Sequence, residues 1–265
     1  MRSKRILAFV SWVLASLVLF IACNQTSTPN STAQAVSLTI SAAASLKDAM
    51  DEIKPLYSKE QPTVKLTYNF GSSGALQQQI EQGAGVDIFI SAANKQMDAL
   101  KQKGLLVDDT RKGLLKNKLV LIVPQSSNDI KDFQDLASPR IKKIALGEPK
   151  SVPAGQYAQQ VLTSLKIADQ IKNKAVYAKD VRQALNYVES GNTDAGIVYL
   201  SDAKSTQKVK VVATAPENSH SPIVYPIAVL KSSKHIDAAK NFVQFLSRNA
   251  AKSIFEKQGF SLAGS

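Results

Sequence analysis

The segment SLTISAAASL, residues 37–46, predicts a strand that leads directly into the start of a helix. Its first half has the β-branched and apolar residues of a strand, and the small residues 42–44 let a partner approach the backbone closely. Ser45 then stands where a helix N-cap belongs, with Asp48 three positions on as the other half of a capping box. Because a helix N-terminus offers unpaired N–H groups and partial positive charge, this stretch predicts a turn that suits an anion.

A second junction of the same kind lies at FGSSG, residues 70–74. A predicted strand over 64–70 ends there, and a helical stretch follows from Ala75 to Gln82. Two strand-to-helix junctions with small residues in one chain suggest a site for a small oxyanion.

Two further helix starts lie in the middle of the chain. Pro153 suits the first turn of a helix, which exposes the amides of Ala154 and Gly155. Asp180 is placed to cap the helix that begins at Val181. Because the Asp180 carboxylate caps its own helix, the candidate anion donor at this position is the amide of Val181.

Strands and helices alternate along the chain, which predicts an α/β fold of mostly parallel sheets with helices on both faces. Pro55 is expected to kink or shorten the first helix. Strands are predicted near 37–41, 64–70, 86–91, 118–124, 143–146, 175–178, 194–200, 209–213 and 222–230. Helices are predicted near 45–58, 74–83, 94–104, 153–166, 180–191 and, with a break, 235–258. The apolar runs at 118–124 and 224–230 could carry the chain to a second lobe and back, so lobe 1 is predicted as 36–118 plus 226–265 and lobe 2 as 119–225.

The N-terminus indicates export. Residues 1–22 begin with positive charge and continue as an uncharged apolar run, which predicts a signal peptide. Cys23, the one cysteine of the chain, follows small residues as in the lipobox of bacterial lipoproteins, although Phe20 stands where Leu is usual. We therefore expect a lipid anchor at Cys23 and a flexible tether over 23–35. The alternatives are ordinary secretion with an incidental cysteine, or an uncleaved membrane anchor.

Charge and composition exclude one class of partner. The chain has 265 residues, enough for two lobes, and a formal net charge of +12. Arg2, Lys4 and Arg5 lie in the predicted leader, and the remaining lysines are scattered without interleaved aromatic residues. A basic helix or a nucleic-acid motif is missing from the sequence, so nucleic-acid binding is not expected.

Six segments, in order and spacing, resemble the periplasmic molybdate-binding proteins of ABC transporters. The resemblance runs from about Leu38 to Phe260 and departs from the family at Gly74, where some relatives have Ser. The segments are residues 42–46, 70–74, 87–92, 152–158, 180–182 and 196–199.

The resemblance implies a two-lobed, type II periplasmic-binding-protein fold with the ligand in the cleft between the lobes. It implies an extracytoplasmic, monomeric protein that captures molybdate or tungstate and delivers it to a membrane permease and its ATPase, without catalysis and without a cofactor. The implied ligand groups are the hydroxyls and amides of Ser45 and Ser73, the amides of Ala154 and Val181, and the Tyr199 hydroxyl. These groups would bind the oxygens of the anion, and no side chain would bind the metal directly.

The chemistry of such a site agrees with that expectation. Molybdate and tungstate carry no proton at neutral pH, so each oxygen accepts hydrogen bonds and none donates. A pocket of N–H and O–H donors favours them over hydrogen phosphate, whose proton would lack a partner. Sulfate has the same charge and shape, so only the size of the cavity can exclude it.

Three other classes of function, a hydrolase, a metal-binding protein and a structural lipoprotein, are less well supported by the sequence. In a hydrolase, Ser45 or Ser73 would be the nucleophile, but neither lies in a Gly-x-Ser-x-Gly elbow. His220 and His235 have the sequence context of surface residues, and no pair has metal-ligand spacing. A structural lipoprotein would not need several helix starts with small residues. A single tyrosine such as Tyr199 is more often part of a core, and it gains weight here only from its neighbours.

Overall fold

The computed structural model describes residues 35–264. The predicted signal peptide, Cys23 and the tether up to residue 34 lie outside the described residues. Within 35–264, no helix combines the length and the apolar character that a membrane span requires.

One sheet has six strands in the order β11-β4-β10-β3-β1-β2. Strand β1 pairs in parallel with β2 and β3, whereas β10 runs antiparallel to β3 and β4, and β11 antiparallel to β4. The strands are β1 (Val36–Ala43), β2 (Val64–Gly71), β3 (Ile88–Ile90), β4 (Lys112–Lys116), β10 (Val224–Val229) and β11 (Ser261–Leu262).

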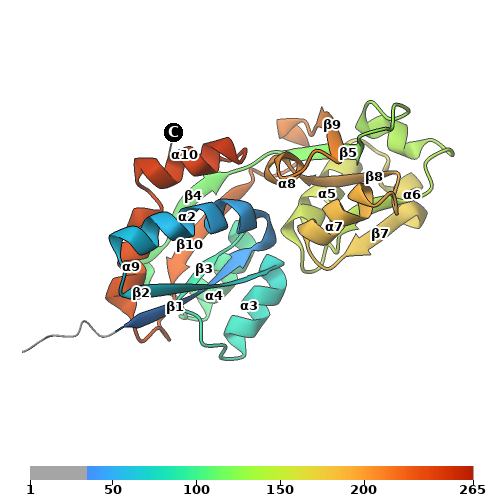
Figure 1. The fold of residues 1–265 in the computed structure, drawn as a ribbon. Helices are drawn as coiled ribbons and strands as arrows, with labels where there is room; N and C mark the ends of the chain where they lie inside the picture. Colours follow the sequence, from blue (N-terminus) through green and yellow to red (C-terminus); the bar gives the residue numbers. More distant parts are fainter. Residues whose placement is uncertain (1–34, 265) are drawn as a thin grey trace, which may run out of the picture. The chain divides into compact units, whose positions relative to one another are not determined.

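Helices cover both faces of this sheet (Figure 1). Strand β3 shows why: Ile88 and Ile90 belong to the larger apolar core, and Phe89 between them belongs to a second, smaller core. The first face packs against α2 and α9, and the second against α3 and α4. The helices around this sheet are α2 (Lys47–Glu60), α3 (Ser73–Glu81), α4 (Asn94–Gln102), α9 (Ile236–Phe245) and α10 (Asn249–Lys257).

The other sheet has five strands in the order β7-β6-β8-β5-β9. Its β8 is buried along its whole length, which requires cover on both faces, and α5 and α7 pack on it. The strands are β5 (Leu119–Pro124), β6 (Ile144–Gly147), β7 (Ala175–Ala178), β8 (Ala195–Tyr199) and β9 (Val209–Thr214). The helices are α5 (Pro153–Ser164), α6 (Ala168–Ile171), α7 (Val181–Glu189) and α8 (Leu200–Lys204).

Both sheets are mixed, so the prediction of mostly parallel sheets was wrong. Strand β5 is antiparallel to β8 and β9, as β10 is to β3 and β4. The reason lies in the two segments that pass between the sheets, from β4 to β5 and from β9 to β10. They lie side by side, with the Asn117 N–H donating to the Ile223 carbonyl at 3.2 Å. Neither contains a crossover helix: the first leads directly into β5, and the second contains only the short 3₁₀ turn η5 (Glu217–Ser219). The boundaries predicted for the two lobes stay a prediction.

Pro55 was expected to kink or shorten the first helix, which was predicted near 45–58. It does not shorten the helix, because α2 continues to Glu60 with Pro55 inside it. Pro55 lies on the exposed face of the helix, where water can satisfy the carbonyl that a proline leaves without a donor. The predicted break in the last helical segment is present as the separation between α9 and α10.

Candidate anion-binding site

Several helix starts and strand ends surround one small cavity. Its volume is about 10 Å³, which is room for about one water-sized group. It lies between the two sheets, because its walls come from the ends of β1, β2 and β3 on one side and from the starts of α5 and α7 and the end of β8 on the other. None of its lining residues carries a charged side chain. The lining residues are Ala43, Ala44, Ser45, Gly71, Ser72, Ser73, Ala92, Val152, Pro153, Ala154, Val181 and Tyr199.

Ser45 lines the cavity, but it is not the N-cap that the sequence predicts. A short 3₁₀ turn, η1 (Ala44–Leu46), begins one residue earlier and leads directly into α2, so Ser45 lies inside the turn. Its hydroxyl instead forms a 2.8 Å hydrogen bond with Tyr225 Oη. Asp48 makes no capping box either, because its carboxylate pairs with Arg182.

Ser73 is the first residue of α3 and is fully buried. The neighbouring Ser72 caps the helix, since its Oγ accepts from the Ala75 N–H at 3.3 Å. The Oγ of Ser73 accepts from the Ala92 N–H at 2.9 Å. Because that bond uses the oxygen as an acceptor, the hydroxyl proton of Ser73 is left to donate.

Ala154 and Val181 are first-turn residues whose amides have no acceptor within their own helices. Pro153 begins α5, as predicted, and puts Ala154 in second place. Asp180 caps α7, also as predicted: its Oδ1 accepts from the Gln183 N–H at 2.9 Å. Both amides therefore add N–H donors and partial positive charge to the cavity wall.

Tyr199 ends β8, and only 1% of it is exposed. Among the described residues, its hydroxyl has no hydrogen-bond partner. Burial raises the pKa of Tyr199 well above its ordinary value, and the nearby Tyr225 adds to the effect, so the phenol keeps its proton. A buried, protonated and unpartnered donor at the cavity wall is a group that a ligand oxygen could satisfy.

The polar groups behind Ser45 were not predicted from the sequence. Tyr225 on β10 is fully buried, and its Oη lies 3.3 Å from Asn117 Nδ2 as well as 2.8 Å from Ser45 Oγ. Asn117 Nδ2 also donates to Ser201 Oγ at 2.9 Å. No local pattern could identify this group, because Tyr225 and Ser45 are 180 residues apart in the chain.

Arg182, directly after Val181, connects elements that pack on different sheets. It pairs with Asp48 at the start of α2 and, through Nε at 2.8 Å, with Asp202 of α8. Burial raises the pKa of Asp202 to about 6, against the opposing effect of Arg182. These charges lie behind the cavity wall and are paired with one another.

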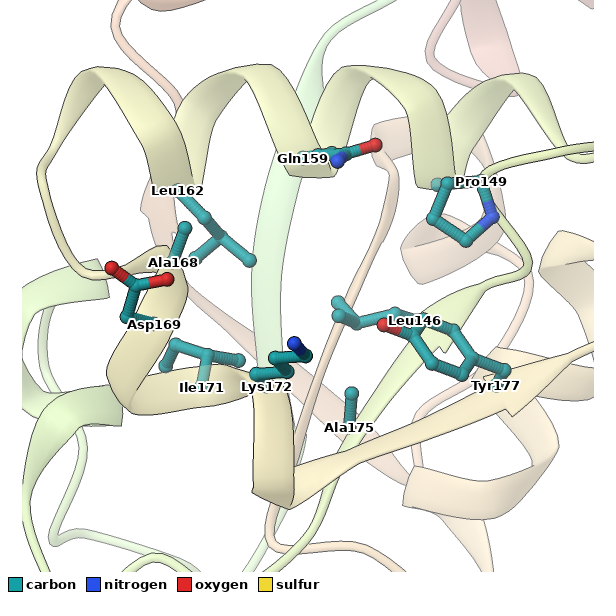
Figure 2. A pocket seen from close by; sticks show the side chains of 11 residues that line it. Leu146, Pro149, Gln159, Leu162, Ala168, Asp169, Ile171, Lys172, Ala175 and Tyr177 are labelled. Atoms are coloured by element: carbon teal, nitrogen blue, oxygen red, sulfur yellow. The ribbon is translucent and has the colours of Figure 1, made fainter.

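Other hollows lie away from the predicted residues. Figure 2 shows one of about 290 Å³ between α5, α6 and β7, where Gln159 and Tyr177 lie on its rim. It contains none of the five predicted ligand residues. Within residues 35–264, no group of three or more His, Cys, Asp or Glu side chains converges as metal ligands would, and the absence of a cofactor stays a prediction.

Comparisons with known proteins agree with this architecture. The family model described as bacterial extracellular solute-binding protein matches residues 38–261. The molybdate-binding protein ModA of Haemophilus influenzae is 40% identical over 233 residues, 86% of this chain and 91% of that protein. YvgL of Bacillus subtilis, named as an ABC transporter substrate-binding lipoprotein, is 44% identical over 249 residues, 94% of this chain and 95% of that protein.

A solved structure gives the same result. The substrate-binding domain assigned to a molybdenum ABC transporter of Clostridium difficile has a TM-score of 0.68 and 52% identity, over 86% of this chain and 99% of that one. The predicted α/β, two-lobed fold and the predicted resemblance are therefore confirmed.

Proposed function

We infer the function from the family: this chain belongs to the bacterial extracellular solute-binding proteins, which bind solutes and are not a family of enzymes. We propose that it captures molybdate or tungstate outside the cytoplasm and delivers the anion to a membrane permease driven by an ATPase. Its similarity to ModA and YvgL supports this role.

The observation that carries the proposal is the chemistry of the cavity wall. The groups available to a ligand are the hydroxyls of Ser45, Ser73 and Tyr199 and the first-turn amides of Ala154 and Val181. All of them donate, and the wall contains no carboxylate that could accept a proton. A tetrahedral dianion without a proton matches such a wall, and helix N-termini disperse its charge without a lysine or arginine.

The cavity has room for about one water-sized group, so a tetrahedral anion can enter only if the walls move apart. The amide of Gly74 on α3 donates to the Ser151 carbonyl before α5 at 2.9 Å, and Arg182 joins α7 to α2. We propose that these contacts hold the two lobes together around the anion, and that a small outward movement of the walls admits it.

We also propose that the mature protein is a lipid-anchored monomer. Cys23 would carry the lipid, and residues 23–35 would be the tether; the similarity to the lipoprotein YvgL supports this. Cys23→Ser should release the protein from membranes without changing its affinity for the ligand. A variant that still fractionates with membranes would rule out lipidation at Cys23.

Calorimetric titration of the purified mature protein against molybdate, tungstate, sulfate and phosphate tests the function. We expect sulfate and phosphate to bind at least about a hundredfold more weakly than molybdate, roughly 2.7 kcal/mol. Equal affinities for sulfate and molybdate would favour a sulfate carrier, and no heat with any of the four anions would contradict oxyanion binding.

A further inference from the structure

We propose that Tyr225 forces the Ser45 hydroxyl to donate into the cavity, and that Tyr225 is therefore a positioning residue for anion selectivity. This inference rests on the proposed function and specifies how the pocket would reject a protonated anion. Tyr225 does not line the cavity; it acts through its 2.8 Å hydrogen bond with Ser45.

The direction of the hydrogen bonds is set at Asn117. The Oδ1 of Asn117 accepts from the backbone N–H of Lys118 at 2.8 Å. A backbone amide can only donate, so the atom that faces it must be the oxygen, and the other end of the side chain must be the NH₂ group. Nδ2 therefore donates, to Ser201 Oγ at 2.9 Å and to Tyr225 Oη at 3.3 Å.

Because Tyr225 Oη accepts from Asn117, its own proton must be donated to Ser45. Its Oη accepts from Asn117 and has one proton of its own to give, and the pKa of Tyr225 is raised well above its ordinary value by burial, so that proton stays in place. Two groups lie in hydrogen-bond geometry with Oη; Asn117 Nδ2 can only donate, so Ser45 Oγ is the acceptor. If Ser45 donated instead, the fully buried phenol proton would have no acceptor in hydrogen-bond geometry.

Ser45 Oγ thus accepts from Tyr225 and keeps its own proton for the cavity. The Ala92 N–H has the same effect on Ser73: it donates to Ser73 Oγ, so the Ser73 proton remains available to donate into the cavity. Each hydroxyl oxygen keeps a second lone pair, but turning it towards a ligand proton would direct the serine's own buried proton away from the cavity, where the described residues offer it no acceptor. A bare dianion finds donors only, whereas the proton of hydrogen phosphate finds no acceptor, and the pocket rejects it.

Tyr225→Phe removes the donor behind Ser45 and keeps the ring. The Ser45 hydroxyl can then rotate and accept, so molybdate should bind about tenfold more weakly while phosphate loses little or gains. At neutral pH, the dissociation constant for phosphate divided by the dissociation constant for molybdate should fall by about tenfold. Tyr57→Phe is the matched control: Tyr57 is also buried, but it packs against Phe242 and Phe245 away from the cavity, and its removal should leave the ratio unchanged.

Asn117→Asp gives a second, independent test that applies even if Tyr225→Phe does not fold. Aspartate keeps the size and the acceptor for Lys118, but replaces the NH₂ donor with an oxygen that competes for the Tyr225 proton. It should lower the molybdate-to-phosphate selectivity in the same way.

Circular dichroism and melting temperature identify the folded variants. If folded variants bind both anions more weakly by the same factor, or keep the selectivity of the unmodified protein, Tyr225 has a structural role only and the inference is overturned. If the unmodified protein binds neither anion, it is the proposed function that is wrong, and this outcome is distinguishable from a failure of the inference about Tyr225.

Discussion

At the scale of single residues, the Tyr199 hydroxyl gains most from a bound ligand. It is buried, protonated and without a partner among the described residues, a state that costs free energy in the empty protein. A ligand oxygen would remove that cost.

Tyr199→Phe should therefore separate stability from binding. Without ligand, the variant should melt no lower than the unmodified protein, because an unsatisfied donor is replaced by an apolar edge of the same shape. Its affinity for molybdate should fall by about 1–2 kcal/mol, roughly tenfold. Melting curves and calorimetry measure the two effects. A large loss of stability with normal binding would place the hydroxyl outside the site.

Val181 should act through its amide and not through its side chain. Position 181 is the first residue of α7, where proline suits the backbone, and the extended Asp180 before it (φ −155°, ψ 172°) tolerates a following proline. Val181→Pro should lower molybdate affinity by roughly 1.5–3 kcal/mol, about ten- to a hundredfold. Val181→Ala, which keeps the amide, should bind nearly normally. Calorimetry on both variants decides, and a folded Val181→Pro protein with full affinity would remove this amide from the site.

At the scale of elements, the start of α3 approaches the turn before α5 closely. A Cβ at Gly74 would lie 2.5 Å from the Ser151 carbonyl oxygen, so only glycine fits the present spacing.

Gly74→Ala should push α3 away from Ser151 and widen the cavity, with a loss of molybdate affinity of about 1–3 kcal/mol. Helix α3 itself should not suffer, because alanine is the better helix former. Gly85→Ala is the matched control, since a Cβ there meets nothing within 4 Å. Equal affinities of the two variants would mean that this contact does not matter for binding.

Short-range sequence patterns predicted most of the helices and strands, but they did not predict which distant segments pair with one another. The cap at Asp180 and the proline at the start of α5 depend on neighbouring residues, so the sequence was sufficient to place them. Strands β4 and β11 were missed because they are short and owe their existence to pairing with distant segments. The same holds for the bond between Tyr225 and Ser45, which only the folded chain brings together.

At the scale of the whole molecule, Asp202 makes stability depend on pH. Its pKa is raised by burial from 3.8 to about 6 in the folded protein, so the folded state holds this proton more tightly than the unfolded chain does. Stability contributed by Asp202 is therefore present below about pH 4 and is lost as the pH rises towards about 6.

The Asp202→Asn variant has no titrating group at position 202, so it should not lose this contribution to stability as the pH rises. The melting temperature of the unmodified protein relative to the variant should fall between pH 4 and pH 6 and then level off. Taking the difference between the two proteins cancels the other carboxylates. A difference that rises over the same interval would mean that Arg182, and not burial, dominates the environment of Asp202.

The position of the bound anion can be measured directly by anomalous X-ray diffraction. Crystals of the mature protein grown with molybdate would give an anomalous scattering peak at the molybdenum absorption edge. We predict one peak in the cavity, with the oxygens of the anion within hydrogen-bonding distance of Ser45, Ser73, Ala154, Val181 and Tyr199. A peak elsewhere, for example in the hollow of Figure 2, would contradict this account of the site.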